Sequence, residues 1–371
     1  MLIDKQLKYS YNDVSVIPAY VSTIEHRNEC NPFLEDNKLP IFTAPMSTVV
    51  NLDNFVLFEN NYINTILPRN IDLDTRIDYV KKGKWVAFSL NEFIDLFVND
   101  KNIEEFNNST IKHVLIDVAN GHMMKIYQNT QKAKEIFGDN IEIMVGNIAN
   151  PHSYMLAYNY GVSYVRVSIG SGQGCITSSN TSIHYPNASL IDETFKVKKE
   201  ISEKNGIPID KLPKIIADGG IRNYSDVIKA LALGADYVMI GGLFSTLIES
   251  AGNIFYFDEK QQKTIIQDKY SIKEQDGVFH DNVKIINHEL YKEFYGMASK
   301  KGQIDINGKK TKTSEGVTKI LKVTTNIHKW VNNMISYLQS AMSYTNIKNV
   351  KFMNSAHVIL ISNNTYNSVN K

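Results

Sequence analysis

The chain has 371 residues, of which 43% are hydrophobic and 21% charged, so it can bury one large core or two small ones. Its 40 basic and 39 acidic side chains give a net charge of +1 without any dense basic block, which argues against a nucleic-acid partner. No apolar run reaches the ~18 residues of a membrane span, no apolar signal core opens the chain, and two cysteines make no disulfide framework. We therefore expect a cytoplasmic protein with no membrane partner.

Eight short apolar segments follow an N-terminal arm. They are rich in valine, isoleucine and tyrosine without strict alternation, which is typical of strands covered on both faces. Segments with helical spacing, such as 123–137 and 224–233, lie between most of them. This pattern predicts an α/β fold, a (β/α)8 TIM barrel, with a doubly wound open sheet as the alternative. The expected strands are 40–44, 62–67, 85–90, 113–118, 141–145, 164–169, 214–217 and 237–240.

Polar and glycine residues follow several of these strands. Active sites of TIM barrels are built at the carboxyl ends of the strands, so these residues are candidates for a site. The last two strands both end in diglycine turns, where backbone amides can bind a phosphate. The candidates are Asp117, Val118 and Ala119 after strand four, Gly146 and Asn147 after five, Asp218, Gly219 and Gly220 after seven, and Gly241 and Gly242 after eight.

The loop after strand six, residues 169–177, reads Ile-Gly-Ser-Gly-Gln-Gly-Cys-Ile-Thr. Its alternate glycines let the backbone bend tightly and approach a ligand or an ion. We interpret Cys175 as a nucleophile, with the Thr177 hydroxyl beside it. A buried structural cysteine is the alternative interpretation.

Two longer segments break the barrel repeat. Residues 171–213 are too long for a simple crossover, and residues 253–307, after strand eight, are interpreted as a mobile flap. Beyond the flap, Glu315 follows a run rich in lysine and threonine, and a helix is expected at 327–344. An exposed loop glutamate is ordinarily solvated surface, which is the alternative to a functional role. We expect one domain over 1–371, made of the arm 1–39, the barrel core 40–252 and the flap and C-terminal helical region 253–371.

Seven motifs, in order along the chain, resemble those of the IMP dehydrogenase and GMP reductase family. The resemblance implies a (β/α)8 barrel assembled as a homotetramer, with a purine nucleoside monophosphate as substrate. It also implies a shared chemistry, in which a cysteine thiolate attacks purine C2. The motifs are 11–18 (Tyr-Asn-Asp-Val-Ser-Val-Ile-Pro), 40–46 (Pro-Ile-Phe-Thr-Ala-Pro-Met), 170–177, 216–221 (Ile-Ala-Asp-Gly-Gly-Ile), 238–242 (Val-Met-Ile-Gly-Gly), 295–297 (Tyr-Gly-Met) and 314–316 (Ser-Glu-Gly).

The resemblance also implies residue roles. Cys175 forms the covalent adduct, while Thr177 and Glu315 relay a proton to the departing amine. Backbone carbonyls of Gly170, Gly172 and Cys175 match a monovalent-cation site, for potassium. The substrate-binding positions are Asp218, Gly219, Gly220, Gly241, Gly242, Gly296, Met297, Ser314 and Gly316. The positions that match contacts to the dinucleotide are Arg27, Arg69, Asp117, Val118, Ala119, Ser340 and Tyr344.

Within the family, the chain is most similar to GMP reductase, which uses NADPH to convert GMP to IMP. The strand-four end at 117–121 and the flap motif at 294–299 resemble the reductase form, and no Arg-Tyr pair precedes Ser314. The span 70–84 also leaves no room for the regulatory domain that most dehydrogenases insert. An IMP dehydrogenase using NAD and a non-catalytic nucleotide-binding barrel remain alternatives.

The chain departs from the family pattern near several motifs. The cysteine loop has Ser171, Gln173 and Ser178 where the family usually has proline, serine and arginine. Outside the loop, the departures are Pro68 for a common histidine, Arg69 for a lysine, and Lys312 for an arginine.

Overall fold

The computed structural model describes residues 5–99, 106, 110–258, 260–275, 278–280, 286–309 and 313–369. Eight parallel strands form one sheet in the order β2-β9-β8-β7-β6-β5-β4-β3. All eight coincide with expected strands. Their bounds are β2 (Ile41–Thr43), β3 (Ile66–Leu67), β4 (Trp85–Phe88), β5 (Lys112–Asp117), β6 (Ile141–Ile148), β7 (Tyr164–Val167), β8 (Lys214–Asp218) and β9 (Tyr237–Ile240).

Backbone hydrogen bonds close the sheet into a barrel. Asn64, just before β3, forms a parallel bridge with Phe42 in β2. The Asn64 amide donates to the Ile41 carbonyl at 3.0 Å, and its carbonyl accepts from the Thr43 amide at 2.9 Å. The (β/α)8 barrel is thus confirmed, and the open-sheet alternative is wrong.

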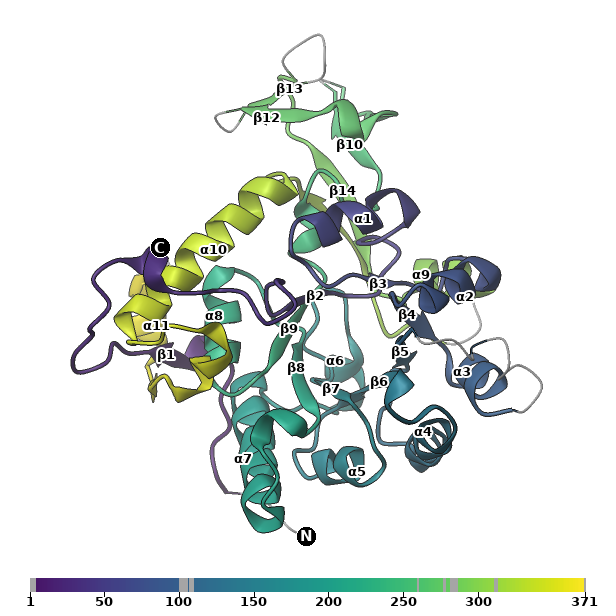
Figure 1. Cartoon of the computed structure of the whole chain (residues 1–371). Coiled ribbons are helices and arrows are strands. Elements are labelled where there is room, and N and C mark those ends of the chain that lie inside the picture. The colour runs from purple at the N-terminus through teal and green to yellow at the C-terminus, as the bar shows by residue number, and fades with distance from the viewer. Residues whose placement is uncertain are drawn as a thin grey trace.

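Helices surround the barrel (Figure 1), and α1, α2, α3 and α8 begin at polar caps whose side chains accept a backbone hydrogen bond. The Ser89 hydroxyl accepts from the Glu92 amide, and the Glu92 carboxylate accepts from the Ser89 amide, so α3 starts with a capping box. Residues 89 and 90, expected in a strand, therefore belong to this helix start. The helices are α1 (Leu52–Asn60), α2 (Leu73–Lys81), α3 (Leu90–Phe97), α4 (Met124–Phe137), α5 (Ser153–Asn159), α6 (Thr177–Thr181), α7 (Asn187–Asn205) and α8 (Tyr224–Ala232).

Apolar side chains fill the inside of the barrel, so it is a packed core and not a pore. The rings of Trp85 and Tyr164 meet edge to face with centroids 5.0 Å apart. This filling leaves the carboxyl ends of the strands as the place where polar groups gather. The inner cluster contains Phe42, Ala44, Ile66, Trp85, Ala87, Leu115, Met144, Ile216 and Met239.

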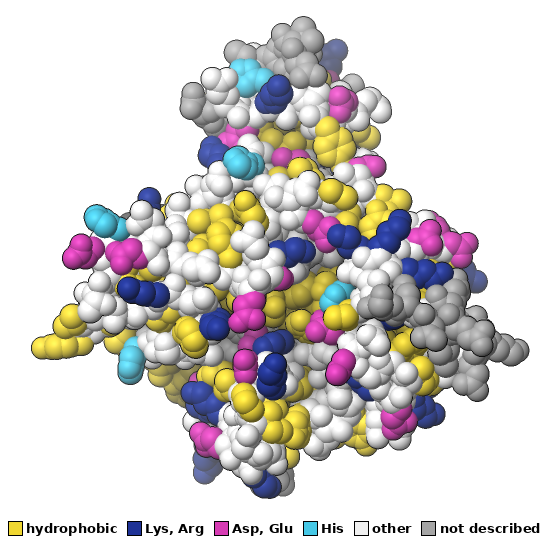
Figure 2. All heavy atoms as spheres, viewed as in Figure 1, with side chains coloured by type: hydrophobic (Ala, Val, Ile, Leu, Met, Phe, Trp, Pro, Cys, Tyr) yellow, Lys and Arg dark blue, Asp and Glu magenta, His cyan; other side chains and the backbone are white. Residues whose placement is uncertain are grey.

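The segment interpreted as a flap folds into an antiparallel module that projects from the barrel at the top of Figure 1. Its sheet has the order β11-β10-β14-β15, and β12 pairs with β13. These strands were not predicted from the sequence, and movement of the module stays a prediction. On the face shown in Figure 2, acidic and basic side chains are interspersed. The elements are β10 (Ile254–Phe257), β11 (Lys263–Ile265), β12 (Lys273–Gln275), β13 (Val278–His280), β14 (Tyr291–Tyr295), α9 (Lys300–Asn307) and β15 (Thr318–Lys322).

The two ends of the chain pair with each other beside the barrel. Strand β1 (Val14–Val16) is antiparallel to β16 (Val358–Leu360), which precedes α11 (Asn363–Val369). Helix α10 (Ile327–Tyr344) has the bounds expected from the sequence. Between β3 and β4 the chain forms only α2, so no domain is inserted there. Among the described residues, none of the helices combines the length and the apolarity needed to cross a membrane.

Candidate active site

A cavity of about 680 Å³ lies at the carboxyl ends of the strands, beneath β14 and α9 of the module. Its lining includes most of the residues singled out in the sequence. These are Arg69, Asp117, Val118, Ala119, Asn147, Gly172, Cys175, Asp218, Gly219, Gly220, Gly241, Gly242, Gly296, Met297, Glu315 and Gly316.

A chain of hydrogen bonds joins the three predicted catalytic side chains. The Cys175 thiol donates to Thr177 Oγ1 at 3.3 Å, and the Thr177 hydroxyl donates to Glu315 Oε2 at 2.8 Å. Thr177 and Glu315 are 138 residues apart in the sequence. The arrangement provides a path for a proton between a sulfur nucleophile and a carboxylate.

Main-chain pairing holds the cysteine loop against the segment that carries the glutamate. Cys175 forms an antiparallel bridge with Gly316, and the Ile176 amide donates to the Glu315 carbonyl at 2.9 Å. The close contact favours glycine at both positions. A Cβ on Gly174 would lie 3.0 Å from the Phe294 ring, and one on Gly316 would lie 3.0 Å from the Gly174 carbonyl oxygen.

The two diglycine turns lie in the cavity wall with little room for side chains. Gly219 and Gly220 have φ values of +94° and +76°, which favour glycine. The Asn187 amide group donates to the Gly219 carbonyl at 2.9 Å and so fixes this turn. A Cβ on Gly242 would lie 2.3 Å from Gln173 Oε1, so the Gln173 side chain lies against the second turn.

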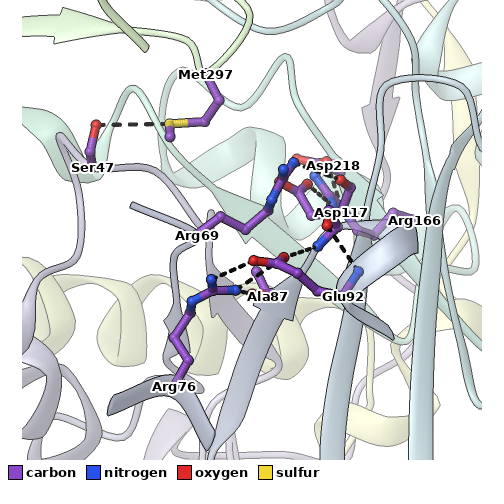
Figure 3. A network of polar contacts seen from close by, with 10 residues as sticks. Ser47, Arg69, Arg76, Ala87, Glu92, Asp117, Arg166, Asp218 and Met297 are labelled. Atoms are coloured by element: carbon purple, nitrogen blue, oxygen red, sulfur yellow. Dashed lines mark hydrogen bonds and ion pairs between the residues drawn. The ribbon is translucent and has the colours of Figure 1, made fainter. Parts of the chain in front are cut away.

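A buried arginine joins the two aspartates of the cavity (Figure 3). Arg166 donates from NH1 to Asp117 Oδ1 at 3.0 Å, and from Nε and NH2 to Asp218 Oδ2 at 3.1 and 2.9 Å. Asn147 Nδ2 donates to the same Asp218 oxygen at 2.7 Å. Burial lowers the pKa of Arg166, but the Asp218 and Asp117 carboxylates raise it by more, so the group stays cationic.

Arg69 approaches Asp117 from the other side. Its NH1 donates to the Asp117 carbonyl at 3.2 Å and lies 4.0 Å from Asp117 Oδ2. Within the described part of the chain, the Arg69 Nε is buried without a hydrogen-bond partner. An orphaned donor beside a cavity is suited to a ligand with a polar edge.

Comparison with known proteins finds a matching family model and relatives over nearly the whole chain. The family model for the IMP dehydrogenase / GMP reductase domain matches residues 8–369. The chain belongs to this family. It is 28% identical to a protein named GMP reductase from Bacillus licheniformis, over 97% of this chain and 98% of the relative. Proteins with the same name from Mesoplasma florum and Staphylococcus aureus are each 26% identical, over 96% and 97% of this chain and 99% and 98% of theirs.

Members of the IMP dehydrogenase / GMP reductase family are purine nucleotide oxidoreductases that use a nicotinamide cofactor. The cavity wall near Asp117 fits the nicotinamide ring of such a cofactor. Val118, Ala119 and Met123 offer apolar contacts, while the unpartnered Arg69 Nε offers a donor. These residues would hold the ring, and the assignment stays a prediction.

Three residues predicted to contact the dinucleotide lie outside the cavity lining. Arg27 starts the short helix η2 (Arg27–Glu29), and Ser340 and Tyr344 lie in the last turns of α10. The two elements adjoin, because Gln339 Nε2 in α10 donates to the carbonyl of Cys30, directly after η2, at 3.0 Å. These three residues therefore lie on two adjoining elements, η2 and α10, outside the cavity lining.

Ser314 also lies outside the lining, and its hydroxyl donates to the Gly316 carbonyl at 3.0 Å. It supports the loop beside Glu315. Lys312, another departure from the family pattern, lies outside the described residues.

Two of the carbonyls predicted to bind potassium already accept hydrogen bonds. The Gly170 carbonyl accepts from the Ser178 hydroxyl and the Gly172 carbonyl from the Cys175 amide, both at 3.0 Å. In the part of the chain that the structure describes, no cluster of three or more His, Cys, Asp or Glu could hold a metal ion. The potassium site stays a prediction.

A second cavity, of about 950 Å³, opens at the amino ends of the strands and contains none of the predicted site residues. Its rim carries ion pairs, among them Lys84 with Glu59 at 2.6 Å and Lys198 with Asp236 at 2.7 Å. Because these charges are satisfied within the chain, we assign no ligand to this cavity.

Proposed function

We propose that the protein is a GMP reductase, which converts GMP to IMP and ammonia with NADPH. The observation that carries the proposal is the hydrogen-bond chain from Cys175 through Thr177 to Glu315, whose two end residues line a cavity that also holds two diglycine turns. The name shared by the three relatives supports the reductase over the dehydrogenase.

In the first step, Cys175 Sγ bonds to C2 of the purine, and the bond from C2 to the exocyclic nitrogen breaks. The thiol proton passes through Thr177 Oγ1 to Glu315, which returns it to the nitrogen. Amine leaves as ammonia because protonation makes it a better leaving group. The product of this step is a thioimidate between Cys175 and the purine.

NADPH, when bound, would supply the hydride that replaces sulfur at C2, so that Cys175 leaves as the thiolate and IMP is released. The Cys175 thiolate then regains a proton from water. Arg69, Asp117, Val118 and Ala119 would orient the cofactor, and the amides of the diglycine turns would bind the substrate phosphate.

The test is to incubate the protein with GMP and NADPH and to follow both NADPH absorbance and ammonia. We expect both to change in a one-to-one ratio, and neither to change with Cys175→Ser. A folded protein that produces no ammonia would overturn the proposal. Production of NADH from IMP and NAD would instead identify a dehydrogenase.

We also propose that the protein works in the cytoplasm as a homotetramer, as its resemblance to the family implies. Light scattering on the purified protein tests the assembly state.

A further inference from the structure

We propose that Arg166 is a positioning residue that couples nucleotide binding to cofactor binding. The inference rests on the proposed function, because that function assigns Asp218 to the ribose of the substrate and Asp117 to the dinucleotide. It goes beyond that function in giving one side chain an effect on both ligands.

The geometry places Arg166 between two carboxylates from different strands. Arg166 lies on β7, Asp117 ends β5 and Asp218 ends β8. The guanidinium makes one hydrogen bond to Asp117 and two to Asp218. Because a guanidinium is planar, a rotation toward one carboxylate changes its contact with the other.

Close packing against the neighbouring strand β6 fixes the position of Arg166. A Cβ on Gly146, in the neighbouring β6, would lie 2.5 Å from Arg166 Cβ, so only glycine leaves room for this packing. The Arg166 side chain is 9% exposed. Charge-assisted hydrogen bonds are strong in such a setting, and their loss leaves carboxylates without their counter-ion.

The hydrogen bonds also determine which oxygen each carboxylate can offer to a ligand. The donors to Asp218, from Arg166 and Asn147, all use Oδ2. Among the described residues no hydrogen bond reaches Asp218 Oδ1, so this oxygen can accept from a ribose hydroxyl. On the other side Arg166 holds Asp117 Oδ1, while Asp117 Oδ2 faces Arg69 at 4.0 Å.

The first experiment measures the dissociation constants of GMP and of NADPH, each alone, by calorimetry on Arg166→Lys. A lysine keeps the charge but cannot bridge both carboxylates. We expect both dissociation constants to rise about tenfold or more, since each ligand loses an oriented carboxylate. A rise for only one ligand, or for neither, would overturn the inference.

Arg76→Lys is the matched control. Arg76 is also a buried arginine that bridges two partners, Glu92 Oε1 at 2.7 Å and the Ala87 carbonyl at 3.0 Å. It lies beside the same network in Figure 3 but does not line the cavity. We expect Arg76→Lys to lower the unfolding temperature while leaving both dissociation constants unchanged.

The second experiment separates coupling from a local defect. Asp218→Asn should change NADPH affinity severalfold when Arg166 is present, and should have no such effect in the Arg166→Lys background. An equal effect in both backgrounds would contradict the proposal. If Arg166→Lys does not fold, two single variants still test the coupling. Asp218→Asn should alter NADPH binding, and Asp117→Asn should alter GMP binding; no such cross-effect in either variant would contradict the proposal.

The two proposals fail in different ways. If the wild-type protein binds no GMP, the proposed function fails and this inference with it. If the wild-type protein releases ammonia from GMP but Arg166→Lys affects one ligand only, the inference alone fails.

Discussion

Thr177 is the middle member of the proposed proton path. A Thr177→Val substitution removes its hydroxyl and keeps a side chain of similar shape. We expect Thr177→Val to lower kcat by about a hundredfold or more, because general acid catalysis of amine departure is lost. The KM for GMP should change little. Steady-state kinetics with GMP and NADPH measure both values.

Ser179→Ala is the control for Thr177→Val. The Ser179 hydroxyl donates to the Ile176 carbonyl at 3.0 Å in the same short helix and lies outside the hydrogen-bond chain from Cys175 to Glu315. Its loss should leave kcat unchanged. An equal fall in kcat for both variants would mean that the helix, and not the Thr177 hydroxyl, matters.

The two cysteines provide a second test at the residue scale. We expect GMP to give a covalent adduct, detected by intact mass, that Cys30→Ala retains and Cys175→Ser lacks. Cys30 is 2% exposed in the core, whereas Cys175 lines the cavity. Cys175→Ser should still bind GMP in calorimetry, because the diglycine turns and Asp218 are unchanged. An adduct on Cys175→Ser would contradict the assignment of the nucleophile.

The cysteine loop and Glu315 could be singled out from the sequence because their motifs are short and continuous. Arg166 was missed, since it reads as one charge within a strand, Tyr-Val-Arg-Val. A charged residue in a strand that should be buried on both faces was the available signal. Its partners, Asp117 and Asp218, could not be paired with it without knowledge of the strand order.

At the scale of elements, Glu274 in β12 connects the module to the start of α10. Its Oε2 accepts from the Thr325 hydroxyl at 2.8 Å and from the Asn326 amide at 3.2 Å, and Oε1 pairs with Lys329 at 2.6 Å. The Glu274 side chain is 3% exposed. Burial raises the pKa of Glu274, but the bonds from Lys329, Thr325 and Asn326 lower it by more, so the net shift is downward from 4.5.

We expect Glu274→Gln to lower the free energy of unfolding by about 1–3 kcal/mol at neutral pH. Because the folded-state pKa is depressed, the contribution of Glu274 is fully present above pH 4.5 and is lost as the pH falls through the lower folded value. Urea unfolding at neutral and acid pH should therefore show a difference between wild type and variant that shrinks in acid.

Glu289→Gln gives the comparison for Glu274→Gln. Glu289 pairs with Lys322 in the same module, but their side chains are 57% and 59% exposed. Exposed pairs contribute little to stability, so this variant should unfold like the wild type. If Glu289→Gln lowers the free energy of unfolding as much as Glu274→Gln does, burial does not explain the contribution of Glu274.

The barrel strands were predictable because each is a continuous apolar run buried on both faces. The strands of the module were not. Strand β15 is largely exposed, and it pairs with β14, from which α9 separates it in the sequence. Such pairing depends on contacts between distant segments, which local patterns do not encode.

For the whole molecule, the seam between β2 and β3 decides whether the barrel is closed. The Asn64 side chain is 5% exposed and donates to the carbonyls of Leu39 and Ile41, both at 3.3 Å. We expect Asn64→Ala to lower the free energy of unfolding by about 1–3 kcal/mol, because two buried side-chain hydrogen bonds across the seam are lost. Urea unfolding followed by circular dichroism measures the loss.

Asn61→Ala serves as the control for the seam. The Asn61 amide group donates to the Leu57 carbonyl at 2.9 Å, at the end of α1 and away from the seam. Asn61→Ala should therefore lower the free energy of unfolding by less than Asn64→Ala does. The reverse order would show that the seam does not limit the stability of the barrel.

The main-chain pairing between the cysteine loop and the segment around Glu315 has a consequence for the residues beside it. Main-chain hydrogen bonds, and not side chains, keep the segments that carry the sulfur and the carboxylate in register. The side chains at neighbouring positions are therefore not needed to hold Cys175 against Glu315. We therefore expect substitutions at Ser171, Gln173 and Ser178 to leave the main-chain pairing between Cys175 and Gly316 intact.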